Sequence, residues 1–63
     1  MIANPKRHQK VMTPDGKGKI YCFEDFRNDY RIGVKHDIFP AHKPRMYKNN
    51  VLYYFRKEVS LLA

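Results

Sequence analysis

Apolar residues along the chain gather in short runs separated by turn-forming residues. At 30–38, YRIGVKHDI, alternate positions from Tyr30 to Val34 are apolar, and the positions between them hold Arg31, Gly33 and Lys35. A period of two indicates a half-buried strand. We therefore expect Arg31 and Lys35 to share its outward face.

Four further segments complete a five-stranded pattern. KIYCFEDF at 19–26 and VLYYF at 51–55 hold β-branched and aromatic residues without Pro or Gly, which favours strands. The first has apolar residues in both phases, which suits a long bent strand that serves two packed sheets. Short strands are expected at 11–12 and 59–62, and 56–58 suits one 3₁₀ turn because it is too short for an α-helix.

Turn signals separate these strands. Residues 13–16, TPDG, predict a turn because proline presets φ and Gly16 can adopt positive φ. Gly18 marks a second bend or the close passage of another strand. Residues 28–29, ND, form the next turn, and 39–48, with two prolines and no regular period, is best interpreted as a long loop.

Length and composition limit the chain to one small domain. It has 63 residues, of which 43% are hydrophobic and 14% aromatic, too many for a disordered chain. Residues 1–9 are basic with little apolar content, so we expect a flexible arm there and a folded domain at 10–63. The arm either frays or adds phosphate contacts.

Charge and cysteine content indicate the kind of partner and the cellular compartment. The net charge of +7, with a pI near 9.8, favours anionic partners, although solubility alone could explain it. Cys22 is the sole cysteine, so no internal disulfide can form and a reducing compartment is the simplest assumption. No apolar run approaches the roughly 20 residues of a membrane span, and no signal peptide is visible. A cytoplasmic protein without membrane contact is expected.

The first turn carries a resemblance to a known group of domains. Residues 11–20 read V-x-T-P-x-G-x-G-x-I, which resembles the opening of KOW-like, Tudor-like and CarD-type modules. The resemblance implies an all-β, five-stranded SH3-like barrel, here with a long loop before the fourth strand and a 3₁₀ turn before the last. It also implies a basic or aromatic surface that meets nucleic acid or protein. The two glycines serve corner geometry, because a phosphate-binding P-loop needs a longer spacing that opens a helix.

The residues of the sequence give little support for a catalytic site. His36, Asp37 and His42 could ligate a metal, but a further ligand at firm spacing is missing. We expect His36 at a strand end and His42 exposed in a loop. Cys22 lacks a basic partner and is interpreted as a small buried hydrophobe. We expect no enzyme, no metal and no cofactor.

The remaining surface is basic with interleaved aromatic residues, which suits phosphate contacts and base stacking. Two aromatics are expected to be exposed, because Tyr47 lies in a loop and Tyr54 is opposite in phase to its neighbours. Core packing is expected for most of Tyr21, Phe23, Tyr53 and Phe55. The predicted nucleic-acid-binding residues are Lys17, Lys19, Arg31, Lys35, Arg45, Tyr47, Lys48 and Tyr54.

A protein-interaction module is the alternative, such as an accessory or inhibitor protein of a mobile element. It would dock an acidic or extended protein partner in a groove on this same basic and aromatic surface. An exposed sheet edge could also recruit a second copy of the chain as a homodimer. Nucleic-acid binding predicts one contiguous basic face, whereas protein docking predicts an exposed apolar patch ringed by charge.

Overall fold

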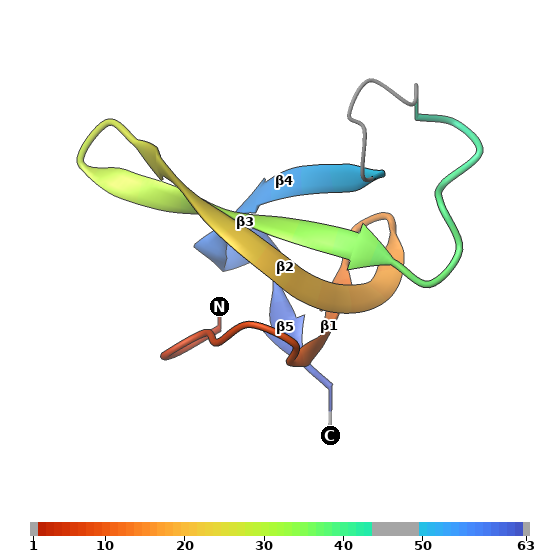
Figure 1. Ribbon diagram of the computed structural model, residues 1–63, viewed down its shortest axis with the longest axis horizontal. Coiled ribbons are helices and arrows are strands. Elements are labelled where there is room, and N and C mark those ends of the chain that lie inside the picture. The colour runs from red at the N-terminus through yellow and green to blue at the C-terminus, as the bar shows by residue number, and fades with distance from the viewer. Residues whose placement is uncertain (1, 44–49, 63) are drawn as a thin grey trace.

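The computed structural model describes residues 2–43 and 50–62 of the chain. They form one antiparallel sheet of five strands in the order β4-β3-β2-β1-β5 (Figure 1). The elements are β1 (Lys10–Thr13), β2 (Gly16–Phe26), β3 (Asp29–His36), β4 (Val51–Phe55), the 3₁₀ turn η1 (Arg56–Glu58) and β5 (Ser60–Leu61). The all-β class, the five strands and the 3₁₀ turn are confirmed. Among the described residues, the edge strands β4 and β5 do not pair with each other.

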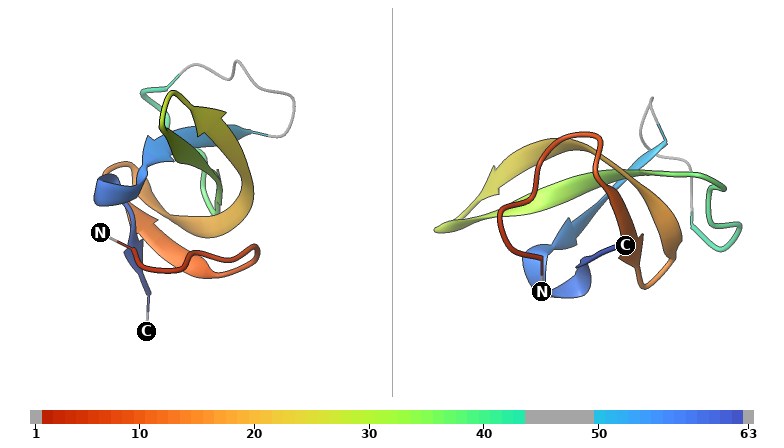
Figure 2. Two further views of the ribbon diagram at one scale, coloured as in Figure 1. Left: turned by 90° about the vertical axis from the view of Figure 1, so that its left-hand side faces the viewer. Right: turned by 90° about the horizontal axis from the view of Figure 1, so that it is seen from below.

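β2 is the longest strand and bends sharply along its course. Residues 16–19 of β2 pair with β1, and β2 pairs with β3 from Gly18 to its end at Phe26. A register shift between Ile20 and Cys22 leaves Tyr21 as an extra residue, and such a bulge bends a strand. The bend places β1 and β5 on one side of the core and β3 and β4 on the other (Figure 2).

The turn between β1 and β2 shows why the sequence places two glycines there. Gly16 has φ of +121°, in the region that favours glycine. A Cβ on Gly18 would lie 2.5 Å from the carbonyl oxygen of Lys35 and 2.8 Å from the Cα of His36. The predicted turn, the positive φ and the close passage of another strand are confirmed.

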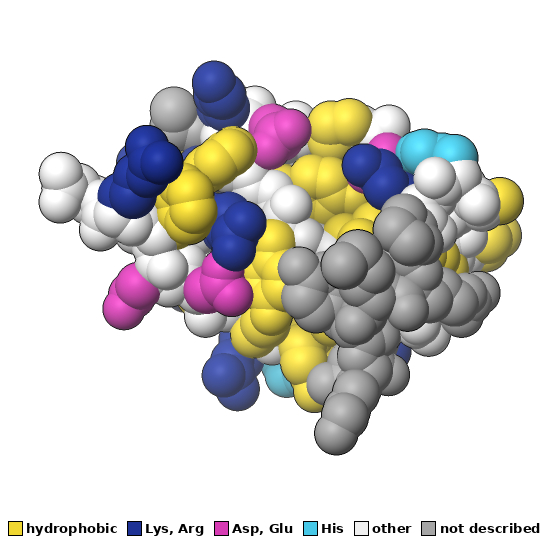
Figure 3. Space-filling view, turned by 90° about the horizontal axis from the view of Figure 1, so that it is seen from above, with side chains coloured by type: hydrophobic (Ala, Val, Ile, Leu, Met, Phe, Trp, Pro, Cys, Tyr) yellow, Lys and Arg dark blue, Asp and Glu magenta, His cyan; other side chains and the backbone are white. Residues whose placement is uncertain are grey.

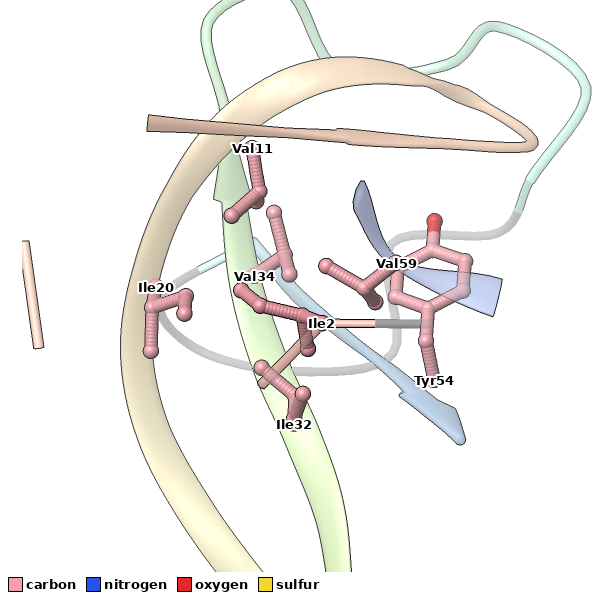
Figure 4. Packing of buried hydrophobic residues seen from close by; sticks show 7 residues of the cluster. All are labelled: Ile2, Val11, Ile20, Ile32, Val34, Tyr54 and Val59. Carbon is pink, nitrogen blue, oxygen red and sulfur yellow. The ribbon is translucent and has the colours of Figure 1, made fainter. Parts of the chain in front are cut away.

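A small, mostly aliphatic core fills the space inside the bend of β2. Its seven buried members come from both ends of the chain and from every strand except β5 (Figure 4). They are Ile2, Val11, Ile20, Ile32, Val34, Tyr54 and Val59. Because a 63-residue domain buries so little, each of these side chains matters to stability.

The N-terminal segment packs against the sheet. Ile2 is only 3% exposed and belongs to the core. The amide of His8 donates to the carbonyl of Ile20 at 2.8 Å, and the amide of Ile20 donates to the carbonyl of Gln9 at 3.0 Å. The predicted boundary at residue 10 therefore does not separate this segment from the domain, because Ile2 anchors it.

Across residues 2–43 and 50–62, no helix has the length and apolar character needed to cross a bilayer.

Candidate functional site

Three lysines lie side by side on the outer face of the sheet. Lys10 of β1 pairs in register with Lys19 of β2, and Lys19 pairs in register with Lys35 of β3. Directly opposed side chains share a face, with Cβ atoms about 4.5–5.5 Å apart. All three are exposed. We call Lys10, Lys19 and Lys35 the lysine row.

No acidic side chain of the described residues neutralises the lysine row. The described ion pairs involve Arg31, His42, Lys43 and Arg56 as the basic partners. Like charges directly opposite each other destabilise a sheet. The row therefore has no evident role in holding the fold together.

The structure brings together the four predicted basic residues that it describes in strands. Lys17 lies two residues before Lys19, and Arg31 lies four residues before Lys35, so all four point to the outer face. Lys10 was missed, because only the register of β1 against β2 shows that it adjoins Lys19. Arg45, Tyr47 and Lys48 lie outside the described residues.

Aromatic side chains adjoin the lysine row on the same face. Tyr53 and Phe55 pair in register with Gly33 and Arg31. Phe26 meets Phe55 edge to face, with ring centroids 5.5 Å apart. We call Tyr21, Phe26, Tyr53 and Phe55 the ring cluster. Tyr21 is 42% exposed and Phe55 41% exposed.

Cations lie against the rings of this cluster. The ammonium nitrogen of Lys35 is 5.8 Å from the centroid of Tyr21. The guanidinium carbon of Arg31 is 4.7 Å from the centroid of Phe26 and 5.5 Å from that of Tyr53. Arg31 also pairs with Glu24. The space-filling view from above Figure 1 shows hydrophobic side chains lying between Lys and Arg side chains (Figure 3).

Gly33 lies in the middle of the ring cluster, where the side chains of its neighbours close over it. A Cβ there would lie 2.7 Å from the sulfur of Cys22 and 3.0 Å from Cε1 of Tyr53. The absence of a side chain lets the Tyr53 ring lie close over the backbone. Its hydroxyl is 3.5 Å from the Cys22 sulfur, and Cys22 is half-buried.

The exposure of four aromatic side chains differs from that predicted. Tyr54, predicted as an exposed stacking ring, is 6% exposed and belongs to the core, because it pairs with Ile32 on the inner face. Tyr21, Phe23 and Phe55 were expected mostly in the core, and all three are exposed. The alternation along β4 was predicted correctly, but its inward and outward sides were exchanged.

Beneath the sheet, the Tyr54 hydroxyl joins a group of polar residues that we call the polar cluster: Thr13, Asp15, His36 and Tyr54. The hydroxyl donates to Oδ2 of Asp15 at 2.7 Å and lies 3.1 Å from Nε2 of His36. Thr13 Oγ1 donates to the carbonyl of Gly16 at 2.8 Å and also lies 3.1 Å from that nitrogen. The cluster thus ties the first turn to the end of β3 and to β4.

These contacts fix the proton on His36. Both hydroxyl protons point at oxygens that can only accept, so Nε2 of His36 must donate. Nε2 therefore carries a proton, and burial of the ring favours its neutral form. Its Nδ1 is buried and has no hydrogen-bond partner among the described residues. Burial lowers the pKa of His36, while the nearby carboxylates of Asp15 and Asp37 act in the opposite direction.

Asp15 connects the polar cluster to the segment that follows β3. Its Oδ1 is 2.9 Å from Nε2 of His42, and its Oδ2 is 3.7 Å from the ammonium of Lys43. The Tyr54 hydroxyl is the main cause that lowers the pKa of Asp15, opposed by partial burial and aided by His42 and Lys43. Burial raises the pKa of Tyr54 above its ordinary value.

The residues that suggested a metal site are separated in this arrangement. His36 ends β3 beneath the sheet, whereas His42 is exposed in a loop, as predicted. Within the described ranges, no three His, Cys, Asp or Glu side chains are grouped to hold a metal ion.

Comparison of the chain with protein-family models, with curated proteins and with solved structures finds no match.

Proposed function

We propose that this chain is a small non-catalytic module with an SH3-like barrel architecture that binds nucleic acid through the lysine row. The strand order β4-β3-β2-β1-β5, the bent β2 and the 3₁₀ turn between the two edge strands support the architecture. Fold alone does not decide function. The functional proposal depends on the outer face.

The lysine row carries the proposal. Three adjacent ammonium groups repel one another when the protein is free. A phosphate backbone would turn this repulsion into attraction and would release bound counterions, the main source of affinity for nucleic acids. Lys17 extends the positive surface on one side of the row, and Arg31, which is paired with Glu24, lies on the other side.

A non-catalytic role is supported by the state of the titratable groups in the polar cluster. The Tyr54 hydroxyl is held beneath the sheet by Asp15 and lies against Nε2 of His36. A general acid or base must instead reach a bound substrate.

The experiment is fluorescence anisotropy of labelled DNA and RNA, single-stranded and duplex, at several salt concentrations. We expect binding that weakens steeply with salt. The double variant Lys19→Gln/Lys35→Gln should weaken binding and lower the salt slope by about 0.7–0.9 for each lost phosphate contact. The proposal fails if no nucleic acid binds at low salt.

The matched control is Lys57→Gln, which removes one positive charge from η1, outside the row. It should leave the salt slope close to that of the parent, whereas Lys19→Gln alone should reduce it. Equal effects of both single variants would show that net charge, and not the row, drives binding.

A protein-interaction module remains a second candidate because of one hollow on the surface. A hollow of about 420 Å³ lies between the first turn and residues 37–42, with Asp15, Lys17 and Asp37 beside apolar Ile38 and Phe39. Ile38 is strongly exposed at this hollow. An extended partner could place an apolar side chain there.

A further inference from the structure

The outer face combines two kinds of chemistry that a duplex would not use together. The lysine row suits phosphates in any nucleic acid. The ring cluster beside it suits the flat faces of bases, but in a duplex those faces are stacked on one another and unavailable. This difference allows the type of nucleic acid to be inferred.

The lysine row and the ring cluster are directly continuous. Lys35 lies opposite Lys19 in register, and its ammonium nitrogen is 5.8 Å from the Tyr21 centroid. A phosphate held by Lys19 and Lys35 would therefore leave its attached base within reach of the Tyr21 ring.

The middle of the ring cluster is a packed surface between two exposed rings. Between Tyr21 and Phe55, the side chains of Cys22, Tyr53 and Val51 close over Gly33. Gly33 is buried and contributes no side chain. Phe55 stands at the far side of this surface, 41% exposed, and gives a second ring.

We infer that the partner is a single-stranded nucleic acid, whose unpaired bases stack on Tyr21 and Phe55 while its phosphates follow the lysine row. This inference rests on the proposed function and adds the strandedness of the partner. The charges are complementary, since the row is positive and not neutralised by the described residues.

Phe23 offers a matched control for the rings. It is 40% exposed, nearly the same as Phe55, but it pairs in register with the buried Ile32 and so lies on the inner face. Its ring meets Tyr30 edge to face at 5.8 Å. A base that stacks on the outer face would not reach it.

The test measures anisotropy at one low salt concentration with three labelled probes of equal length: a thymidine strand, an abasic strand and a duplex. The abasic strand has the same phosphates without bases. We expect the thymidine strand to bind at least about fivefold more tightly than the abasic strand, because each stacked base contributes about 1–3 kcal/mol. The duplex should bind less tightly than the thymidine strand.

Ring variants then locate the effect. Tyr21→Leu and Phe55→Leu should each weaken binding of the thymidine strand by about fivefold or more and leave the abasic strand unchanged. Phe23→Leu should change neither. Thermal unfolding of each variant verifies that it folds, and the comparison of probes with the parent protein needs no variant at all.

The outcomes separate the two proposals. Duplex binding that equals or exceeds strand binding, with loss in Lys19→Gln, would overturn the single-strand inference and leave the proposed function standing. Equal binding of the thymidine and abasic strands would also overturn it. Failure of all three probes to bind would overturn the proposed function and, with it, this inference.

Discussion

The lysine row and the polar cluster lie on opposite faces of the same sheet, and they differ in whether their charged groups have partners. In the polar cluster, the Tyr54 hydroxyl donates to Asp15, and the Asp15 carboxylate also meets His42 and Lys43. On the outer face, three lysines stand together without an acidic partner among the described residues.

This difference separates residues that serve folding from those that serve binding. A buried polar group costs free energy unless it finds a partner, so the hydroxyls of the polar cluster contribute to stability through their hydrogen bonds. Exposed charges bear no such cost in water, and a row of like charges slightly weakens the sheet. Removing a hydrogen-bond partner from the polar cluster should therefore lower stability, whereas removing a charge from the lysine row should raise it.

The largest effect is expected for Tyr54→Phe. The variant removes the donor to Asp15 Oδ2 and a neighbour of His36 Nε2, and it should lower the free energy of unfolding by about 1–3 kcal/mol. Tyr53→Phe is the control, because its hydroxyl lies outside the polar cluster, on the outer face, 3.5 Å from the Cys22 sulfur. Urea unfolding measures both, and equal losses would remove the distinction between the two faces.

A smaller effect is expected from protonation of His36. Its pKa in the folded protein is below the ordinary value of 6.5, so the unfolded chain binds more protons as the pH falls. The contribution of neutral His36 to the free energy of unfolding should be fully present above pH 6.5 and should decrease as the pH falls below that value. Between neutral pH and about pH 5, carboxylates stay ionised and do not obscure the effect.

Thermal unfolding across this pH range measures the slope attributable to His36. His36→Gln should flatten it, although the variant is less stable overall. His42→Gln, which alters an exposed side chain, is the control and should keep the decline. A slope that persists in His36→Gln would place the titrating group elsewhere.

The smallest effect has the opposite sign. Lys19→Thr removes the central charge of the lysine row and should raise the free energy of unfolding by about 0.2–1 kcal/mol. Lys17→Thr is the control, because Lys17 lies in the same strand opposite Met12. The difference between the two variants should shrink with added salt. If Lys19→Thr is no more stable than Lys17→Thr, the row carries no measurable strain.

The sequence predicts the strands well because their signals are local. The alternation at 30–38, the TPDG turn and the VLYYF run all depend on neighbouring residues, and each is found where expected. The positive φ of Gly16 and the crowding at Gly18 follow from the same turn.

The side of the sheet to which each aromatic points could not be predicted locally. In VLYYF both phases are apolar, so only pairing with Ile32 decides that Tyr54 faces inward. The bulge at Tyr21 has no sequence signature and changes the alternation of β2. The place of Lys10 in the row and the burial of Ile2 depend likewise on contacts distant in sequence.

The bend of β2 has a consequence for how the molecule opens. β2 pairs with β1 over residues 16–19 and with β3 from Gly18 to Phe26, so the two sides of the sheet share this one strand and cannot separate without breaking its pairing. The domain is therefore built to unfold as one cooperative unit. Amide protons at the centre of β2 and β3 would exchange with solvent only through that global event, whereas those of the two-residue β5 would exchange through local fraying.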